Sequence, residues 1–278
     1  MSVQFNTDSE FYLWLGEMFE EHMGIPATLV GSQARDFSFI FNKGEKVIDE
    51  LKDEWAGIDP NKLIGFEGVD LSNKEWFGID MPVWLTKGDT SKRRIMIIAM
   101  DPLRKKSATV NPNTISLNTP FTLHDKRVSN NYNKHIHQLA IDNEVYVTDA
   151  FKLFYRDATK YDTLSNSDDE FKDLSIHKEM LMEEIRRFNP DFILCMGADA
   201  IKAIATLGRF KKKSITATHL SYQRDNYSFK NIPVFAIPHP SRSAQGSQKS
   251  FMKLHGVNHP DVLKNYLSEA IKLVERYF

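Results

Sequence analysis

The segment Ile95-Met-Ile-Ile-Ala-Met100 is apolar along its whole length. Three more short segments of this kind follow it: Val145-Tyr-Val-Thr-Asp149, Phe192-Ile-Leu-Cys-Met196 and Val234-Phe-Ala-Ile237. Runs that are apolar on both faces are typical of strands in a parallel sheet that helices cover on both sides. Helices are predicted between and after these strands, at residues 129–141, 170–188, 198–206 and 261–277. The alternation predicts an α/β fold, a three-layer α/β/α sandwich with a four-stranded parallel sheet.

The residues before this pattern are predicted to be helical. Ser9 is the expected N-cap of a first helix, which Gly24 and Pro26 end. A second helix is expected around Glu45 to Trp55. The sequence shows no low-complexity linker and no internal repeat, so we expect a single domain over residues 1–278. In that domain residues 1–90 are a helical N-terminal embellishment and residues 91–278 are the α/β core.

The composition limits the class of protein. Hydrophobic residues make up 41% of the 278 residues, which is enough for a packed core and excludes a disordered chain. The 36 basic and 37 acidic residues nearly cancel, which argues against a histone-like nucleic-acid binder but allows a local basic groove. The single cysteine, Cys195, excludes internal disulfides and cysteine-held zinc or iron–sulfur sites. The start of the chain has no signal-peptide pattern and no apolar run approaches a membrane span, so a cytoplasmic protein is expected.

Polar residues follow each predicted strand. They are Asp101-Pro102, Asp149 with Lys152, Gly197, and His239-Pro240-Ser241. In open α/β sheets the ligand crevice lies beyond the carboxyl ends of the strands, so these residues are expected to meet there. No glycine-rich nucleotide loop follows the first strand and no Gly-x-Ser-x-Gly elbow is present, which disfavours dinucleotide, P-loop and serine-hydrolase sites. We also identify no metal site and expect no cofactor.

These motifs resemble those of the uracil-DNA glycosylase superfamily. Ala99-Met-Asp-Pro102 and Ile237-Pro-His-Pro-Ser241 are similar to the superfamily motifs after the first and last strands. The segments 145–152 and 190–197 resemble its second and third strands, and Asn118-Thr-Pro-Phe121 resembles the loop whose aromatic side chain stacks on a flipped base. The resemblance covers about residues 93–245 and rests on the order of the motifs and their place at strand ends. It implies a DNA base glycosylase in base-excision repair.

The resemblance also implies catalytic roles, which the chemistry of N-glycosidic cleavage makes understandable. The base must leave the stack before its glycosidic bond can be reached, and the sugar then becomes cationic while the base becomes anionic. Asp101 would stabilise the sugar cation and orient water. His239 would donate to O2 of the leaving base, with the backbone N–H of Met100 as a second donor.

The remaining roles concern substrate binding. Phe121 would stack on the base, Asp149 stands where the superfamily reads the base with asparagine, and Ser241 and Lys152 would hold flanking phosphates. The loop after His239, residues 242–246, lacks the large apolar wedge that some members insert into a duplex. Its absence favours single-stranded DNA as substrate. We expect the protein to act as a monomer.

Each of these residues also has a purely structural explanation. Asp101-Pro102 is a common turn starter, Asp149 and His239 occur as caps, Phe121 could fill a core, and Lys152 could be solvated. Two further functions therefore remain open. A catalytically silent nucleic-acid-binding member of the fold would bind DNA without base release, and a nucleoside or nucleotide hydrolase would turn over free nucleosides but not oligonucleotides.

Overall fold

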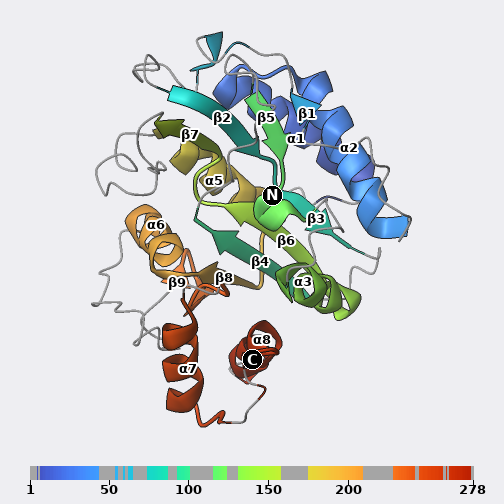
Figure 1. The fold of residues 1–278 in the computed structure, drawn as a ribbon. Helices are drawn as coiled ribbons and strands as arrows, with labels where there is room; N and C mark the ends of the chain where they lie inside the picture. The colour runs from blue at the N-terminus through green and yellow to red at the C-terminus, as the bar shows by residue number, and fades with distance from the viewer. Residues whose placement is uncertain are drawn as a thin grey trace.

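A mixed sheet of six strands lies at the centre of the fold (Figure 1). The computed structural model describes residues 5, 7–43, 54–55, 59, 62–64, 74–86, 93–100, 115–123, 131–157, 175–208, 228–241, 244–258, 261 and 263–276. The strand order is β3-β6-β4-β8-β10-β9. The strands span Val83–Leu85 (β3), Arg93–Ala99 (β4), Asn143–Asp149 (β6), Phe192–Met196 (β8), Ser228–Phe229 (β9) and Ile232–Ile237 (β10).

The four predicted strands are the parallel centre of this sheet. β6, β4, β8 and β10 pair in parallel, whereas β3 and β9 pair antiparallel at the two edges. The expectation of a four-stranded parallel sheet is therefore corrected to a mixed sheet. The edge strands have two or three residues each, which is too short to show an apolar period. β9 and β10 form a hairpin through Lys230 and Asn231, whose positive φ angles of 48° and 72° suit a tight two-residue turn.

Helices cover this sheet on both sides. They span Asn131–Asp142 (α3), Ser175–Phe188 (α5), Ala198–Gly208 (α6), Gln245–Leu254 (α7) and Tyr266–Glu275 (α8). Figure 1 shows α3 and α8 on one side of the row of strands, and α5 and α6 on the other. Right-handed crossovers demand this, because the chain moves from β4 to β6 in one direction and then back across β4 to β8. His135 of α3 and Ser268 of α8 bond to each other at 2.7 Å.

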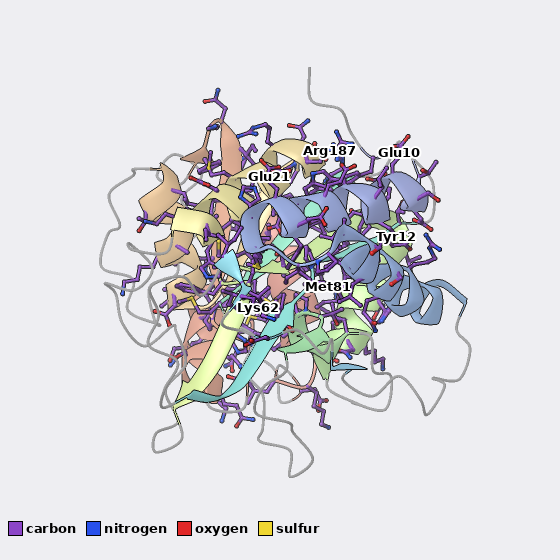
Figure 2. The ribbon with its side chains drawn as sticks, turned by 90° about the horizontal axis from the view of Figure 1, so that it is seen from above. Glu10, Tyr12, Glu21, Lys62, Met81 and Arg187 are labelled. Carbon is purple, nitrogen blue, oxygen red and sulfur yellow. The ribbon has the colours of Figure 1, made fainter. Side chains whose placement is uncertain are left out.

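The N-terminal region is only partly helical. The N-cap of α1 (Asp8–Met23) is Thr7 rather than the predicted Ser9, because the Thr7 hydroxyl accepts from the Glu10 N–H at 3.2 Å. It ends as predicted at Gly24, whose φ of 76° is left-handed. In Figure 2 Glu10 and Glu21 lie on the outer side of α1, whereas Met81 is buried inside.

The second predicted helix is wrong at its last two residues, which are the part of it that the structure describes. α2 spans Ala27–Lys43, and Glu54–Trp55 is a strand, β1; residues 44–53, over which most of the prediction falls, lie outside the described part of the chain. Strands β2 and β3 also lie within the region that was expected to be helical. Helix α1 contacts α5, which lies on the main sheet. One of these contacts is a hydrogen bond from Trp14 Nε1 to Glu183 at 2.8 Å.

A second, smaller sheet was not predicted. Its order is β1-β5-β2-β7, with β2 at Lys74–Asp80, β5 at Ile115–Asn118 and β7 at Leu153–Asp157. β5 leads directly into the short 3₁₀ helix η3 (Pro120–Thr122), which carries Phe121. This sheet therefore sets the position of the loop in which a base-stacking residue was predicted.

None of the helices in the described part of the chain combines the length and the apolarity that a membrane span requires.

Candidate active site

The candidate site lies at the carboxyl edge of the parallel strands. Ala99 of β4 is in register with Asp149 of β6, and Ile237 of β10 is in register with Met196 of β8. Met100, Gly197 and His239 therefore follow strands that end at one edge. The chain changes winding direction between β4 and β8, which is where open α/β sheets bind their ligands. Two strands separate β6 from β10, so the ends of these two strands lie about 14 Å apart at the backbone.

Phe121 and His239 lie next to each other although 118 positions separate them in the chain. Their ring centroids are 6.0 Å apart, and the ring planes meet at 37°. Phe121 is only partly buried and packs at the border of the hydrophobic core. Its φ of 57° is left-handed, a conformation that is costly for an aromatic residue and that is found more often at active sites than elsewhere. The second sheet thus brings Phe121 to the histidine that follows the main sheet.

The ring of His239 is oriented by the residue two positions later. The Ser241 N–H donates to His239 Nδ1 at 3.2 Å, so Nδ1 carries no proton and the ring proton lies on Nε2. Gln248 of α7 donates from Nε2 to the carbonyl oxygens of His239 and Ser241, both at 2.8 Å. The segment is thereby fixed, with the Nε2–H donor on the side of the imidazole opposite Nδ1.

Gly197 is needed beside this histidine because of its backbone. Its φ is 103°, and its N–H donates to the Ile237 carbonyl at 2.8 Å, joining the ends of β8 and β10. A Cβ at Gly197 would lie 3.5 Å from His239 Cβ, which is ordinary contact. The left-handed backbone, rather than space, therefore favours glycine here.

Asp149 is buried at the end of β6, with 2% of its surface exposed. The two residues after it donate to the end of β4: the Ala150 N–H bonds to the Ala99 carbonyl at 2.9 Å, and the Phe151 N–H to the Met100 carbonyl at 3.0 Å. These bonds connect the segment of Asp149 to the segment that leads from Met100 to Asp101. Asp101 itself lies outside the described residues, so its predicted role rests on the sequence motif.

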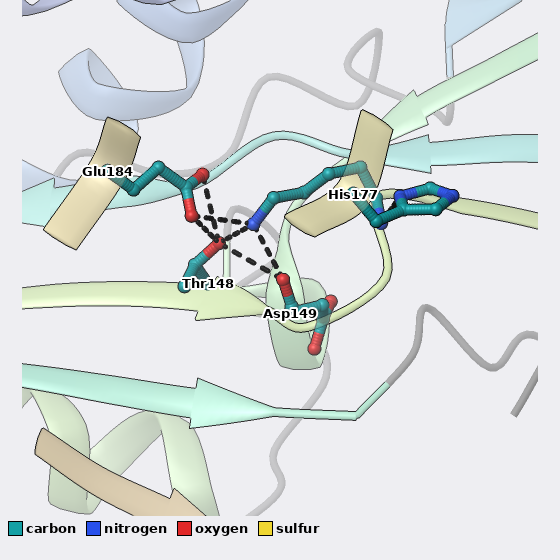
Figure 3. Close-up of polar contacts among 5 residues, drawn as sticks. Thr148, Asp149, His177 and Glu184 are labelled. Atoms are coloured by element: carbon teal, nitrogen blue, oxygen red, sulfur yellow. Dashed lines mark hydrogen bonds and ion pairs between the residues drawn. The ribbon is translucent and has the colours of Figure 1, made fainter. Parts of the chain in front are cut away.

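Lys152 is not on the surface, and this corrects its predicted phosphate contact. Its side chain is fully buried, and Nζ lies 2.8 Å from Glu184 Oε2 (Figure 3). The same ammonium donates to the Asp149 carbonyl at 2.6 Å and to the Thr148 hydroxyl. A buried ammonium with these partners cannot reach DNA. Ser241 is half-buried and accessible, so its predicted phosphate contact stays a prediction.

Several residues around Lys152 were missed by sequence reasoning. His177 and Glu184 of α5 are fully buried. Burial and the Lys152 charge lower the pKa of His177 to about 3, so the ring is neutral. Burial raises the pKa of Glu184, while Lys152 and the hydroxyls of Thr148 and Tyr146 act in the opposite direction. One feature of the sequence does indicate this cluster, because Glu184 stands on the apolar face of α5 that Leu181 and Phe188 define.

The model of the Uracil DNA glycosylase superfamily matches residues 85–267, well over half of the chain. The chain belongs to the uracil-DNA glycosylase superfamily. A comparison with curated proteins found no match. Membership in the superfamily indicates a DNA glycosylase-like, hydrolytic function and DNA as the partner.

The superfamily match covers the strands of the main sheet apart from Val83 and Trp84 of β3, and it contains every predicted site residue. It leaves out α1, α2 and β2. Of these, α1 contacts α5, and β2 pairs with β5, the strand that leads to Phe121. Among the described residues no group of three or more His, Cys, Asp or Glu side chains could hold a metal ion.

Proposed function

We propose that this protein is a DNA base glycosylase that hydrolyses the N-glycosidic bond of a damaged or modified base flipped out of DNA. The observation that carries the proposal is the pairing of Phe121 with His239 at the carboxyl edge of the sheet, 6.0 Å between ring centroids, in a member of the uracil-DNA glycosylase superfamily. A base stacked on the Phe121 ring would present one edge to the imidazole. The pathway that this reaction serves is base-excision repair.

His239 supplies the group that the leaving base needs. As the bond from C1′ to the base nitrogen breaks, its electron pair remains on the base, and negative charge develops on O2. The Nε2–H of His239 would donate to this charge, and the bond from the Ser241 N–H to Nδ1 supports the role because it leaves the ring proton on Nε2. The backbone N–H of Met100 is the proposed second donor.

Asp101 is the proposed partner of the sugar and of water. Its carboxylate would stabilise the cationic sugar and accept a proton from the water whose oxygen attacks C1′. The displaced base takes up a proton after it leaves. Asp101 follows Met100 directly in the sequence, and the Phe151 N–H, which donates to the Met100 carbonyl, holds Met100 beside the segment of Asp149.

Asp149 is the proposed base-reading residue, and its carboxylate argues against uracil as the preferred base. Uracil offers N3–H as a donor and O4 as an acceptor, whereas an ionised carboxylate only accepts. We therefore propose a modified base other than uracil, in single-stranded DNA, as the preferred substrate.

The proposal is tested with single-stranded and duplex oligonucleotides that each carry one lesion. Release of a base leaves an abasic site, which alkali converts into a strand break. His239→Ala should lower the single-turnover rate about 10²–10³-fold, the usual effect of removing one preorganised electrostatic group, with oligonucleotide affinity within a few fold of wild type. The matched control is His137→Ala, in the helix that leads into the amino end of β6, which should leave the rate unchanged. An equal rate in His239→Ala and wild type would refute the role of His239.

A further inference from the structure

Lys152 has three polar groups, and each of them forms at least one hydrogen bond. Its backbone N–H donates to His177 Nδ1 at 3.0 Å, and its carbonyl accepts from the Asp80 N–H at 3.1 Å. Its Nζ donates to Glu184, to the Thr148 hydroxyl and to the Asp149 carbonyl (Figure 3). No part of this residue is exposed to solvent. Lys152 therefore joins segments that the sequence separates widely.

Helix α5 provides two of the three side chains that bond to Lys152; the third is Thr148 of β6. His177 and Glu184 are seven residues apart, which is two helical turns, so they face the same side of α5. The neutral ring of His177 offers a lone pair at Nδ1 to the backbone N–H, and the carboxylate of Glu184 offers its oxygens to the ammonium. One helix thus fixes both the main chain and the side chain of Lys152.

The bonds of Lys152 lead to three elements of the candidate site. Nζ holds the carbonyl of Asp149, and the next residues of this segment bond to Ala99 and Met100 at the end of β4. On the other side, Asp80 is in register with Asn118, three residues before Phe121. The ends of β6, β4 and the pair β2–β5 are therefore connected through one side chain and its backbone.

Stability alone does not account for this arrangement. Removing two charges from water is costly, and a well-packed apolar pair of the same volume is often equally stable or more stable. An apolar pair could not donate to the carbonyl of Asp149. This donation fixes the main chain at the position from which the Asp149 side chain would read the base.

We propose that Lys152, held by Glu184 and His177, is a positioning residue for Asp149, and that it acts on base recognition through the Asp149 carbonyl without touching the substrate. The functional part rests on the proposed glycosylase activity. The structural part, the fixing of the segment from Asp149 to Phe151, stands without it.

The test replaces the buried ion pair by apolar side chains of similar size, in the double variant Lys152→Met with Glu184→Leu. The matched control is Arg94→Met with Glu144→Leu, which removes an ion pair of 3.5 Å between β4 and β6 at their amino ends, away from the candidate site. If the first variant fails to fold, Lys152→Gln with Glu184→Gln replaces it. The amide of glutamine stops one bond short of the position of Nζ, so this variant also loses the donation to Asp149.

Two measurements decide between positioning and simple stabilisation. Amide hydrogen exchange at Ala150 and Phe151 should become at least about tenfold faster in the folded site variant, with amides in the middle of β4 and β8 unchanged, and should stay at the wild-type rate in the control. The single-turnover rate of base release should fall about tenfold or more in the site variant, while oligonucleotide affinity stays within a few fold.

Wild-type exchange at Ala150 and Phe151 in the folded site variant would overturn the inference. Faster exchange with an unchanged rate of base release would overturn its functional part. If the wild-type protein releases no base, the proposed function is refuted. Amide hydrogen exchange does not depend on activity, so it would still decide whether Lys152 fixes the segment from Asp149 to Phe151.

Discussion

Replacing one carboxylate oxygen of Asp149 by an NH₂ group, in Asp149→Asn, tests how this site selects its base. Asp149→Asn keeps the shape of the side chain, and Lys152 holds the backbone carbonyl of this residue rather than its carboxylate. The exchange therefore leaves the supporting bonds in place. Asparagine can accept from N3–H of uracil and donate to O4, whereas the ionised carboxylate would face O4 without a donor.

The size of the effect follows from the burial of Asp149. Only 2% of its surface is exposed, so water does not compensate a mismatched polar contact. One unsatisfied buried polar group costs about 1–3 kcal/mol. At 1.36 kcal/mol for each factor of ten, Asp149→Asn should release uracil roughly 5- to 150-fold faster than the natural protein.

The assay is single-turnover release of uracil from a single-stranded oligonucleotide with one uracil, followed by alkaline scission. Asp142→Asn, an exposed position at the end of α3, makes the same chemical change away from the site and should release uracil at the wild-type rate. If the natural protein releases uracil at least as fast as Asp149→Asn does, then Asp149 does not read the base and the argument from its carboxylate is wrong.

Two further predictions concern the backbone of Phe121 and the buried imidazole of His177. Because Phe121 has a φ of 57°, the free energy of unfolding should be about 1 kcal/mol higher for Phe121→Gly than for Phe121→Ala, while both variants lose base release equally. Chemical denaturation measures this difference, and a more stable alanine variant would contradict the prediction. Burial and Lys152 lower the pKa of His177 from 6.5 to about 3. Between these two values His177 is protonated in the unfolded chain but neutral in the folded protein, so stability is lost as the pH falls from 6.5 towards 3. Between pH 7 and pH 5 the wild type should lose about 2 kcal/mol more unfolding free energy than His177→Gln, whose amide oxygen can still accept from Lys152; equal losses would show that His177 titrates normally in the folded protein.

The parallel strands were predictable because burial on both faces leaves a direct mark on the sequence. The run from Ile95 to Ala99 has no polar residue, and the structure buries all of it. The helix ended by Gly24 was predictable for a similar reason, since a left-handed residue and a nearby proline stop a helix locally.

The second sheet was not predictable from local pattern. β2 reads Lys74-Glu-Trp-Phe-Gly-Ile-Asp80, which mixes charged, aromatic and glycine residues, and β1 has only two residues. Pairing with β5 and β7, which lie far along the chain, stabilises β2. Such non-local contacts override intrinsic preference and leave no period to detect.

The site could be predicted in part. Residues at strand ends follow from topology, so Met100, Asp149 and His239 were placed at one edge by sequence reasoning. The environment of a single lysine does not follow from its neighbours in the sequence, because Lys152 is buried by a helix that begins more than twenty residues later. The orientation of His239 by Ser241 depends on atomic positions that no sequence pattern encodes.

The boundaries of the superfamily match have a practical meaning for anyone who shortens this protein. A fragment cut at residue 85 would retain every candidate site residue but would lose β2, whose Asp80 N–H bonds to the Lys152 carbonyl and whose edge pairs with the strand leading to Phe121. It would also lose α1, so that Glu183 of α5 would give up its bonds to Trp14 and His22, on the same helix that carries Glu184. The smallest unit able to hold the site in shape is thus larger than the region by which the superfamily is recognised, and it includes the N-terminal helix from Asp8 onward.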